Sequence, residues 1–160
     1  MGTESAPARN DAIPPSVGFL LSRLGFSVSL ALAQGLKPLG IEPQHFGLLR
    51  AMLLTEGQSQ RAIGDSLGIP ANRMVVLVDD LEARGAVKRA KHPSDRRAYS
   101  LSMTSKGRTL FEQAVEVAIA VEQRLCEGLS DADRKQLLEL LGRLQNLSDA
   151  PPGVHPGLTV

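Results

Sequence analysis

The hydrophobic pattern of residues 69–108 changes period once, at Gly85, and this change limits the folds that the chain can adopt. Before Gly85, apolar residues recur every three or four positions, as they do on one face of a helix. After Gly85, apolar residues occupy every second position, as in a half-buried strand. The helical face consists of Met74, Leu77, Val78 and Leu81, and the strand face of Tyr99, Leu101 and Met103. The pattern therefore predicts a helix followed by a short β-strand.

A second strand is expected just before this one, because residues 87–91 can pair with it across a turn that contains Pro93. The hairpin so formed is strongly basic. Residues 84–108 hold eight Lys or Arg and a single acid, Asp95, although the whole chain has a formal net charge of only +1. Such a local excess of cations favours nucleic-acid binding, because Lys and Arg neutralise phosphates. The alternative is a solvated charged loop, which the excess of cations disfavours.

The segment before residue 69 predicts a short helix that Gly68 ends, followed by a tight Leu-Gly-Ile-Pro turn. Two helices joined in this way form a helix-turn-helix, whose second helix enters the major groove of DNA. The first turn of that helix carries Asn72 and Arg73. Asn pairs with adenine and Arg with guanine, each through two hydrogen bonds. The alternative is that both are ordinary exposed polar residues beside a proline.

Helical periodicity extends over most of the remaining chain. Aromatic residues make up only 3% of the sequence, so the core must be mainly aliphatic, which suits helices packed on helices. The last periodic segment, 137–147, holds more leucines than one small chain can cover. Thr104 and Ser130 are expected to cap the last two helices. We therefore predict a mainly α fold with a small β-wing, between a flexible N-terminal arm (1–14) and a flexible C-terminal tail (149–160).

Several functional classes are disfavoured by the sequence. It holds no nucleophile elbow, no Gly-rich phosphate loop and no His-Glu-x-x-His pattern, so we do not expect an enzyme. Cys126, the only cysteine, is expected to pack rather than to act in redox chemistry. The three histidines are scattered, so neither a metal site nor a cofactor is expected. The N-terminal segment lacks the apolar stretch of a secretory signal, and the apolar runs are interrupted before the length of a membrane span. We expect a cytoplasmic protein without membrane contact.

The order of the helices, and the sequence DRRAYSLSMTSKG after LEARGAVKR, resemble the MarR family of winged-helix transcription regulators. The family's wing motif, Asp-x-Arg, stands here as Asp95-Arg96-Arg97, and the resemblance covers residues 16–147. It implies a winged helix-turn-helix DNA-binding domain at 43–103 and a helical dimerisation region formed by residues 15–37 and 104–148.

The resemblance also implies a function. Members of the family act as homodimers on pseudo-palindromic operators in double-stranded DNA, commonly as repressors, and small anionic or aromatic ligands often release them. Arg97 is then expected to reach the minor groove, with Asp95 orienting it. The residues expected at the DNA are Asn72, Arg73, Arg84, Lys88, Arg89, Lys91, Asp95, Arg96 and Arg97.

A ligand in this family lies between the dimerisation helices and the winged domain. Arg23 could pair with a carboxylate there, and His45 could add a second donor. The alternative is that the aromatic residues belong to the core and that the histidine is structural. The candidate ligand residues are Phe19, Arg23, Phe26, His45 and Phe46.

The predicted recognition helix departs from the family pattern, because Val75, Val76 and Asp80 stand where Ser, Thr and Arg are common. Asp79 and Asp80 are expected to face away from phosphates, which they would repel. This departure leaves two other hypotheses open. The protein could be an architectural DNA binder of low specificity, or a protein-interaction module that has lost DNA binding.

Overall fold

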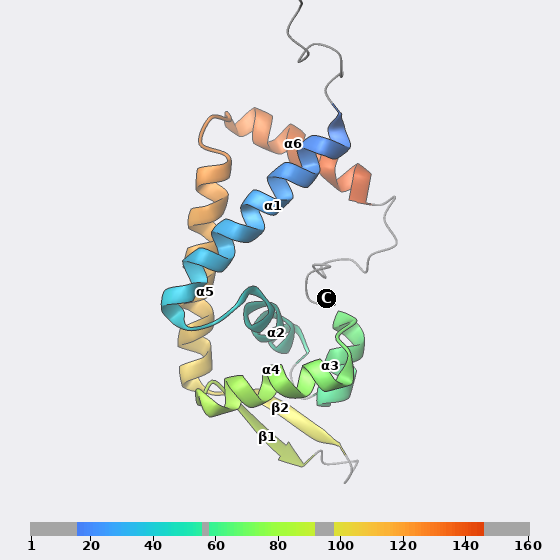
Figure 1. Ribbon diagram of the computed structural model, residues 1–160, viewed down its shortest axis with the longest axis vertical. Coiled ribbons are helices and arrows are strands. Elements are labelled where there is room, and N and C mark those ends of the chain that lie inside the picture. Colours follow the sequence, from blue (N-terminus) through green and yellow to red (C-terminus); the bar gives the residue numbers. More distant parts are fainter. Residues whose placement is uncertain (1–15, 56–57, 92–97, 146–160) are drawn as a thin grey trace, which may run out of the picture.

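The computed structural model describes residues 16–55, 58–91 and 98–145 of the 160-residue chain. Figure 1 shows α5 running the length of the molecule, with α1 and α6 at one end and the other helices and the hairpin at the opposite end. The fold is mainly α with a small two-stranded β-wing, which confirms the predicted fold class. The elements, in chain order, are α1 (Val17–Leu36), the 3-10 turn η1 (Lys37–Leu39), α2 (Pro43–Leu54), α3 (Gln60–Leu67), α4 (Ala71–Ala83), β1 (Val87–Lys91), β2 (Tyr99–Met103), α5 (Ser105–Leu125) and α6 (Asp131–Gln145).

A single hydrophobic core joins α2, α3, α4 and the hairpin. The predicted inner face of α4 lies in this core, and each of its four side chains is at most 4% exposed. Burial of one such aliphatic side chain contributes about 1.5–3 kcal/mol. The core side chains enclosed most completely here are Leu48, Leu49, Ile63, Met74, Val78, Leu81 and Val87.

The turn between α3 and α4 is as tight as predicted. Gly68 ends α3 with φ = 64°, a left-handed conformation that favours glycine. The Ile69 N–H donates to the Gly64 carbonyl at 2.9 Å, and the Ile69 side chain returns to the core. A Cβ at Gly64 would lie 3.4 Å from the Ile69 carbonyl oxygen. This close packing fixes the angle at which α4 leaves α3 and presents its outer side.

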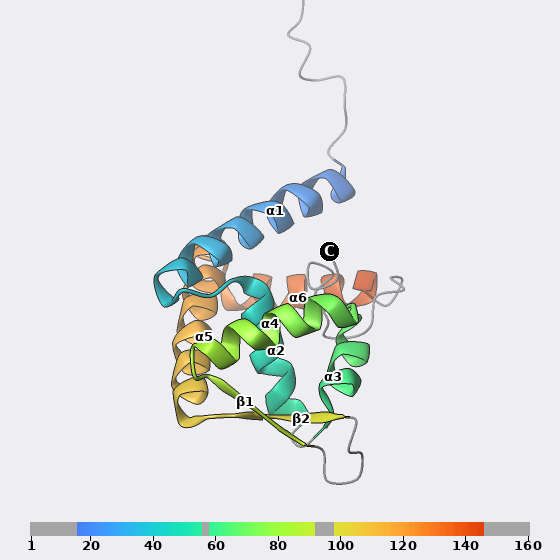
Figure 2. The same ribbon diagram turned by 60° about the horizontal axis from the view of Figure 1, so that its bottom comes forward.

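The predicted pairing of residues 87–91 with the next strand is confirmed: the wing is an antiparallel pair in which Val87 lies opposite Met103 and Lys91 opposite Tyr99. Figure 2 shows the hairpin beside α4. Leu101 faces the core, but Tyr99 is 53% exposed, so the expectation that Tyr99 shares the buried face is wrong. Tyr99 lies beyond the edge of the core, where its side chain borders a surface hollow between the wing and α4.

The start of α5 is locked to the base of the wing. The Thr104 hydroxyl accepts from the Gly107 N–H at 3.0 Å, which confirms Thr104 as the cap, and donates to the Gly85 carbonyl at 2.7 Å. A Cβ at Gly107 would lie only 2.0 Å from the Ala86 carbonyl oxygen. Only a glycine therefore lets α5 approach β1 this closely.

The last helix is capped as predicted. The Ser130 hydroxyl accepts from the Asp133 N–H at 3.2 Å, and the Asp133 carboxylate accepts from the Ser130 N–H at 3.1 Å. Hydrogen bonds from Ser130 lower the pKa of Asp133. None of the residues of α6 is buried in the single chain, although the helix is rich in leucine. The cap thus holds a helix whose apolar side is left exposed among the described residues.

Helix α1 is also largely uncovered. Only Leu36 is buried among its residues. The segment Val17–Leu39 is long and apolar enough, by length and composition, to cross a membrane, so the expectation that no stretch reaches such a span is wrong. Scattered Ser, Gly and Gln break the run without lowering its mean hydropathy below that of a span. The exposed large apolar residues of α1 and α6 are Val17, Phe19, Leu20, Leu21, Leu24, Phe26, Leu30, Leu137, Leu138, Leu140 and Leu144.

Candidate nucleic-acid interface

The outer side of α4 is the centre of the candidate interface. Because its inner face is buried, helical spacing places Asn72, Val76 and Asp79 along the line that points away from the core. Asn72 and Arg73 are both exposed in the first turn, where the sequence placed the base-reading residues. The Arg73 Nη2 donates to Oε1 of Gln44 on α2 at 2.6 Å. This contact holds the guanidinium at the edge of the helix.

The basic residues of the wing are displayed beside α4. Lys88 and Lys91 on β1 are exposed, and Arg84, which follows α4, is half-buried. These three cations lie on elements adjacent to the outer side of α4, where phosphates of a duplex in contact with α4 would pass. The predicted wing-tip residues Asp95, Arg96 and Arg97 lie outside the described residues.

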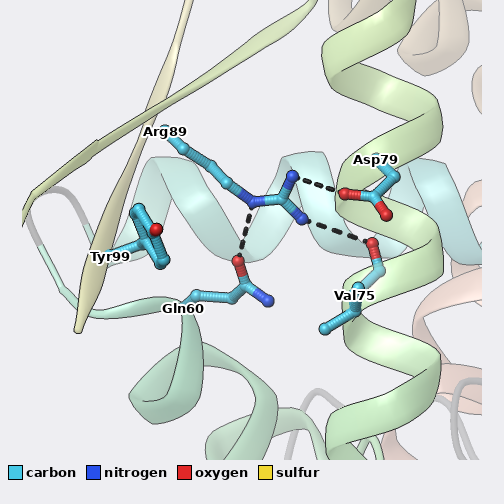
Figure 3. A pocket seen from close by; sticks show the side chains of 5 residues that line it. All are labelled: Gln60, Val75, Asp79, Arg89 and Tyr99. Atoms are coloured by element: carbon cyan, nitrogen blue, oxygen red, sulfur yellow. Dashed lines mark hydrogen bonds and ion pairs between the residues drawn. The ribbon is translucent and has the colours of Figure 1, made fainter. Parts of the chain in front are cut away.

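Arg89 is placed differently from the other wing cations. Its side chain is only 18% exposed, and its Nη1 donates to a carboxylate oxygen of Asp79 and, at 2.8 Å, to Oε2 of Glu82. Its Nε donates to Oε1 of Gln60 at 3.1 Å, and its backbone N–H donates to Oε1 of Glu82 at 3.2 Å. Figure 3 shows the guanidinium between α3 and α4, with Tyr99 beside it. Arg89 thus joins the wing to α4 by charge-assisted hydrogen bonds.

No sequence pattern singles out Gln60 or Glu82 as site residues, and Tyr99 is expected only on the buried face of its strand. Asp79 had been expected to face away from phosphates, but its carboxylate lies on the outer side of α4, where Arg89 neutralises it. A usable signal did exist, because Asp79 and Glu82 are three residues apart and therefore share one flank of the helix. Two acids on the flank next to a basic strand indicate a pairing of this kind.

A second polar cluster joins α4 to α2. The Nδ1 of buried His45 accepts from the Glu42 N–H at 3.1 Å, and its Nε2 lies 3.0 Å from Oδ2 of Asp80. The same Asp80 oxygen accepts from Arg84 Nε at 3.2 Å and Nη2 at 3.1 Å. Burial lowers the pKa of His45, and Arg84 adds to this effect, against the opposing influence of Asp80 and Glu42. A neutral ring with its proton on Nε2 satisfies both contacts.

The candidate ligand residues are not brought together within one chain. Both nitrogens of His45 are engaged, and the Phe46 ring packs on Phe111 with centroids 5.6 Å apart. Phe19 and Phe26 are exposed on the N-terminal half of α1, and the Arg23 guanidinium lies 5.8 Å from the centre of the Phe19 ring. In Figure 1 that half of α1 lies away from α2.

The structure instead shows an open, mostly apolar groove between α1 and α5. Three polar side chains line it, Ser27 and Gln34 from α1 and Arg124 from α5. The remaining lining residues are Val28, Ala31, Gly35, Val117, Ala120, Val121 and Leu125. Such a groove offers apolar contact along its length and a cation near one position.

Cys126 follows α5, and its thiol lies against Glu122. Cys126 is buried, and desolvation together with a hydrogen bond to Glu122 raises the pKa of its thiol. A raised pKa is the opposite of what a reactive cysteine needs. Across residues 16–55, 58–91 and 98–145, no three His, Cys, Asp or Glu side chains are grouped so that they could hold a metal ion.

A helix-turn-helix with an exposed second helix, followed by a basic β-hairpin, defines a winged-helix DNA-binding protein. Residues 39–98 match the model of the MarR family. The chain is also 32% identical to a MarR-family transcriptional regulator of known structure from Rhodococcus sp. RHA1, with a TM-score of 0.68 and with 84% of this chain and 95% of that one covered. The chain belongs to the MarR family of transcriptional regulators.

Two further relatives are similar over most of their length. A protein of Thauera aromatica, named as a transcriptional regulator for the hcr operon, is 29% identical over 91% of this chain and 93% of its own. The repressor CouR, solved on a 23-mer DNA duplex, is 31% identical with a TM-score of 0.72, and covers 81% of this chain and 92% of its own. CouR from Rhodococcus jostii RHA1 has also been solved with p-coumaroyl-CoA, at 33% identity and a TM-score of 0.66, covering 84% of this chain and 95% of that one.

Proposed function

We propose that this protein is a homodimeric transcriptional repressor that binds a pseudo-palindromic operator and leaves it when a small ligand binds. The observation that carries the proposal is the exposed outer side of α4 beside the exposed cations of β1. This arrangement has the shape and charge of a major-groove reader with a phosphate-contacting wing. The likeness to CouR, which was solved on a DNA duplex, supports it.

The residues then take different roles at the DNA. Asn72 and Arg73 read base edges, because they stand in the exposed first turn of α4. Lys88 and Lys91 contact phosphates, and Arg84 adds positive charge while it pairs with Asp80. Asp95, Arg96 and Arg97 keep the roles that the family resemblance implies for the wing tip.

Arg89 has a positioning role in this proposal, rather than a direct phosphate contact. Its guanidinium neutralises Asp79 and lies against Glu82, two carboxylates that would otherwise repel the DNA backbone. The same contacts hold β1 at a fixed distance from α4. A single side chain therefore sets both the charge of the recognition surface and the place of the wing.

The dimer is proposed from the apolar surfaces of α1 and α6. Both helices expose large apolar side chains at the same end of the molecule, remote from the wing (Figure 1). A second copy covers both helices at once, whereas a membrane would require α6, with its charged residues, to lie against lipid as well. We therefore propose that residues 15–37 and 104–148 form the dimerisation region of a cytoplasmic protein, and that residues 43–103 form its DNA-binding domain.

The groove between α1 and α5 is the proposed effector site. Its apolar lining suits an aromatic or aliphatic group, and Arg124 supplies a cation for an anionic one. CouR, solved with p-coumaroyl-CoA, offers a precedent for a ligand of mixed apolar and anionic character. The contacts of His45 and Phe46 within α2, α4 and α5 make the pair a weaker candidate.

Binding to defined duplexes tests this function against its alternatives. The full chain is titrated, by fluorescence anisotropy at several salt concentrations, with the DNA upstream of its own gene and with a scrambled duplex of equal composition. A repressor binds the upstream DNA far more tightly, with an affinity that falls steeply as salt rises. Equal affinity for both duplexes supports an architectural DNA binder. No binding even at low salt supports a protein-interaction module.

A further inference from the structure

Two valines stand on the outer side of α4, where a DNA reader commonly carries polar side chains. Val75 is 43% exposed and Val76 is 66% exposed. Valine is a poor helix former, and its exposed methyl groups add nothing to the stability of a helix in water. The fold alone therefore gives no reason for a valine at the more exposed of the two positions.

The two valines have different surroundings. Val75 faces the wing, where its side chain borders the hollow around Arg89 and its carbonyl accepts from Arg89 Nη2 at 3.4 Å (Figure 3). Val76 lies one turn after Asn72, on the line of the helix that points away from the core. Val75 is thus partly explained by contacts within the chain, and Val76 points outward beside a predicted base reader.

The charge around Val76 offers no cation for a phosphate. The acids that follow it on the helix, Asp79 and Glu82, share the single positive charge of Arg89, and Arg73 is turned toward Gln44 on α2. The middle of the outer side of α4 is therefore apolar, with its nearest arginines already engaged. Such a surface does not suit a phosphate. It suits an uncharged apolar group on a base edge, and the apolar group that the major groove displays is the C5-methyl of thymine.

We propose that Val76 is a specificity-determining residue that packs against the C5-methyl of a thymine in each half-site, next to the base read by Asn72. This inference rests on the proposed function, because it requires sequence-specific binding to a duplex. It predicts that the operator has an A·T pair at the position facing Val76. That pair is recognised by shape and by contact with the thymine methyl group rather than by a hydrogen bond.

The test uses the full-length protein and begins with selection of its preferred duplex from a pool of random sequences. The selected duplex is then resynthesised with uracil in place of thymine, one position at a time, which removes the methyl and keeps the base pair. At one thymine in each half-site, the wild-type affinity should fall about fourfold, as loss of one buried methyl-sized group predicts. Uracil at other positions serves as the internal control.

Val76→Ala and Val75→Ala form a matched pair of variants on the same helix. Val76→Ala should lose about fourfold in affinity for the thymine duplex and should become insensitive to uracil at that position, because the two changes remove the same contact. Val75→Ala should keep the uracil sensitivity of the wild type. Circular dichroism of both variants checks that the helices are retained.

The outcomes separate this inference from the proposed function. A selected duplex that binds equally well with uracil at every position overturns the methyl contact while leaving the repressor proposal intact. The same holds if Val76→Ala remains as sensitive to uracil as the wild type. A selection that enriches no duplex overturns the sequence-specific function, and the inference with it.

Discussion

The Arg89 guanidinium on β1 lies 2.8 Å from Oε2 of Glu82 on α4, and the Arg89 backbone N–H donates to the other oxygen of the same carboxylate. One acid thus binds both the side chain and the main chain of a residue on the wing. The wing and the recognition helix are joined across seven residues of sequence by a contact that periodicity does not reveal. Its loss should affect binding more than folding, because the Asp79 and Glu82 carboxylates are exposed enough to be hydrated when Arg89 is absent.

Replacement of Arg89 by Met should lower DNA affinity roughly tenfold, because Asp79 and Glu82 would then face the DNA backbone without a neutralising cation. The free energy of unfolding should fall by only about 1 kcal/mol. Anisotropy titration and urea denaturation measure the two effects. Lys135→Met removes a cation from α6, at the opposite end of the molecule, and serves as the control. Equal affinities of the two variants would contradict the positioning role.

Arg73 and Lys91 should differ in the kind of binding that they contribute. Replacement of Arg73 by Ala should relax discrimination at one base pair by about 1–3 kcal/mol, because a base-edge contact is lost. Replacement of Lys91 by Ala should weaken all duplexes alike and reduce the slope of log affinity against log salt by about 0.9. Titrations of an operator and its point variants over a salt series measure both quantities. Identical behaviour of the two variants would refute the division of roles.

His45 should make the protein less stable at mildly acidic pH. Its folded-state pKa lies below the ordinary value of 6.5, so the neutral ring is favoured by folding and its contribution is complete above pH 6.5. As the pH falls below 6.5, His45 in the unfolded chain takes up a proton before His45 in the folded chain does. The free energy of unfolding therefore decreases progressively until the pH reaches the folded-state pKa. Asp80 and Glu42 moderate this effect of burial on the pKa, and Arg84 adds to it.

The measurement is the melting temperature between pH 7.5 and 5.5 for the wild type and for His45→Gln. The melting temperature of the wild type should fall further over this pH range than that of the variant, because glutamine takes up no proton at position 45. Parallel curves would show that the titration of His45 is not linked to folding.

Replacement of Gly107 by Ala should destabilise the fold by about 1–3 kcal/mol, because the new Cβ would collide with the Ala86 carbonyl and push α5 away from β1. Gly128→Ala is the control, since a Cβ there meets nothing within 4 Å and should change stability by less than about 0.5 kcal/mol. Urea denaturation measures the free energy of unfolding of both variants. A Gly107 variant as stable as the wild type would mean that α5 and β1 can separate without cost.

Replacement of Leu144 by Glu should convert the dimer to a monomer, because α6 would carry a charge into the proposed interface. Leu54→Glu changes another exposed leucine, at the end of α2 in the proposed DNA-binding domain, and should leave the dimer intact. Sedimentation equilibrium measures the mass of each variant. A dimer that persists in the Leu144 variant would place the interface elsewhere.

The fold could largely be predicted from the sequence because its signals are local. Gly68 marks the turn between α3 and α4, Thr104 the cap of α5, and the change of period at Gly85 the start of the wing. The contacts of Arg89 and His45 could not be predicted in this way. Each joins side chains from separate elements, and such pairs depend on how the elements pack rather than on the spacing along any one of them.

The part of the candidate site that could be predicted is the part that depends on local periodicity. Exposure of Asn72 and Arg73 follows from the buried stripe of α4, which periodicity gives directly. The exposure of Tyr99 does not follow, because alternation along β2 says which side a residue faces but not where the core ends. The five candidate ligand residues do not meet in one chain, because residue type carries no information about the distance between helices.

Thr104 closes β2 and opens α5 in a single residue, with its hydroxyl bonded to both sides of the junction. No loop separates the wing from α5, so the hairpin and the 21-residue helix turn together as one lever. At about 1.5 Å per residue the lever is roughly 30 Å long, and a tilt of about 5° at one end moves the other by roughly 3 Å. A small displacement of α5 at the groove between α1 and α5 would therefore move the wing relative to its DNA.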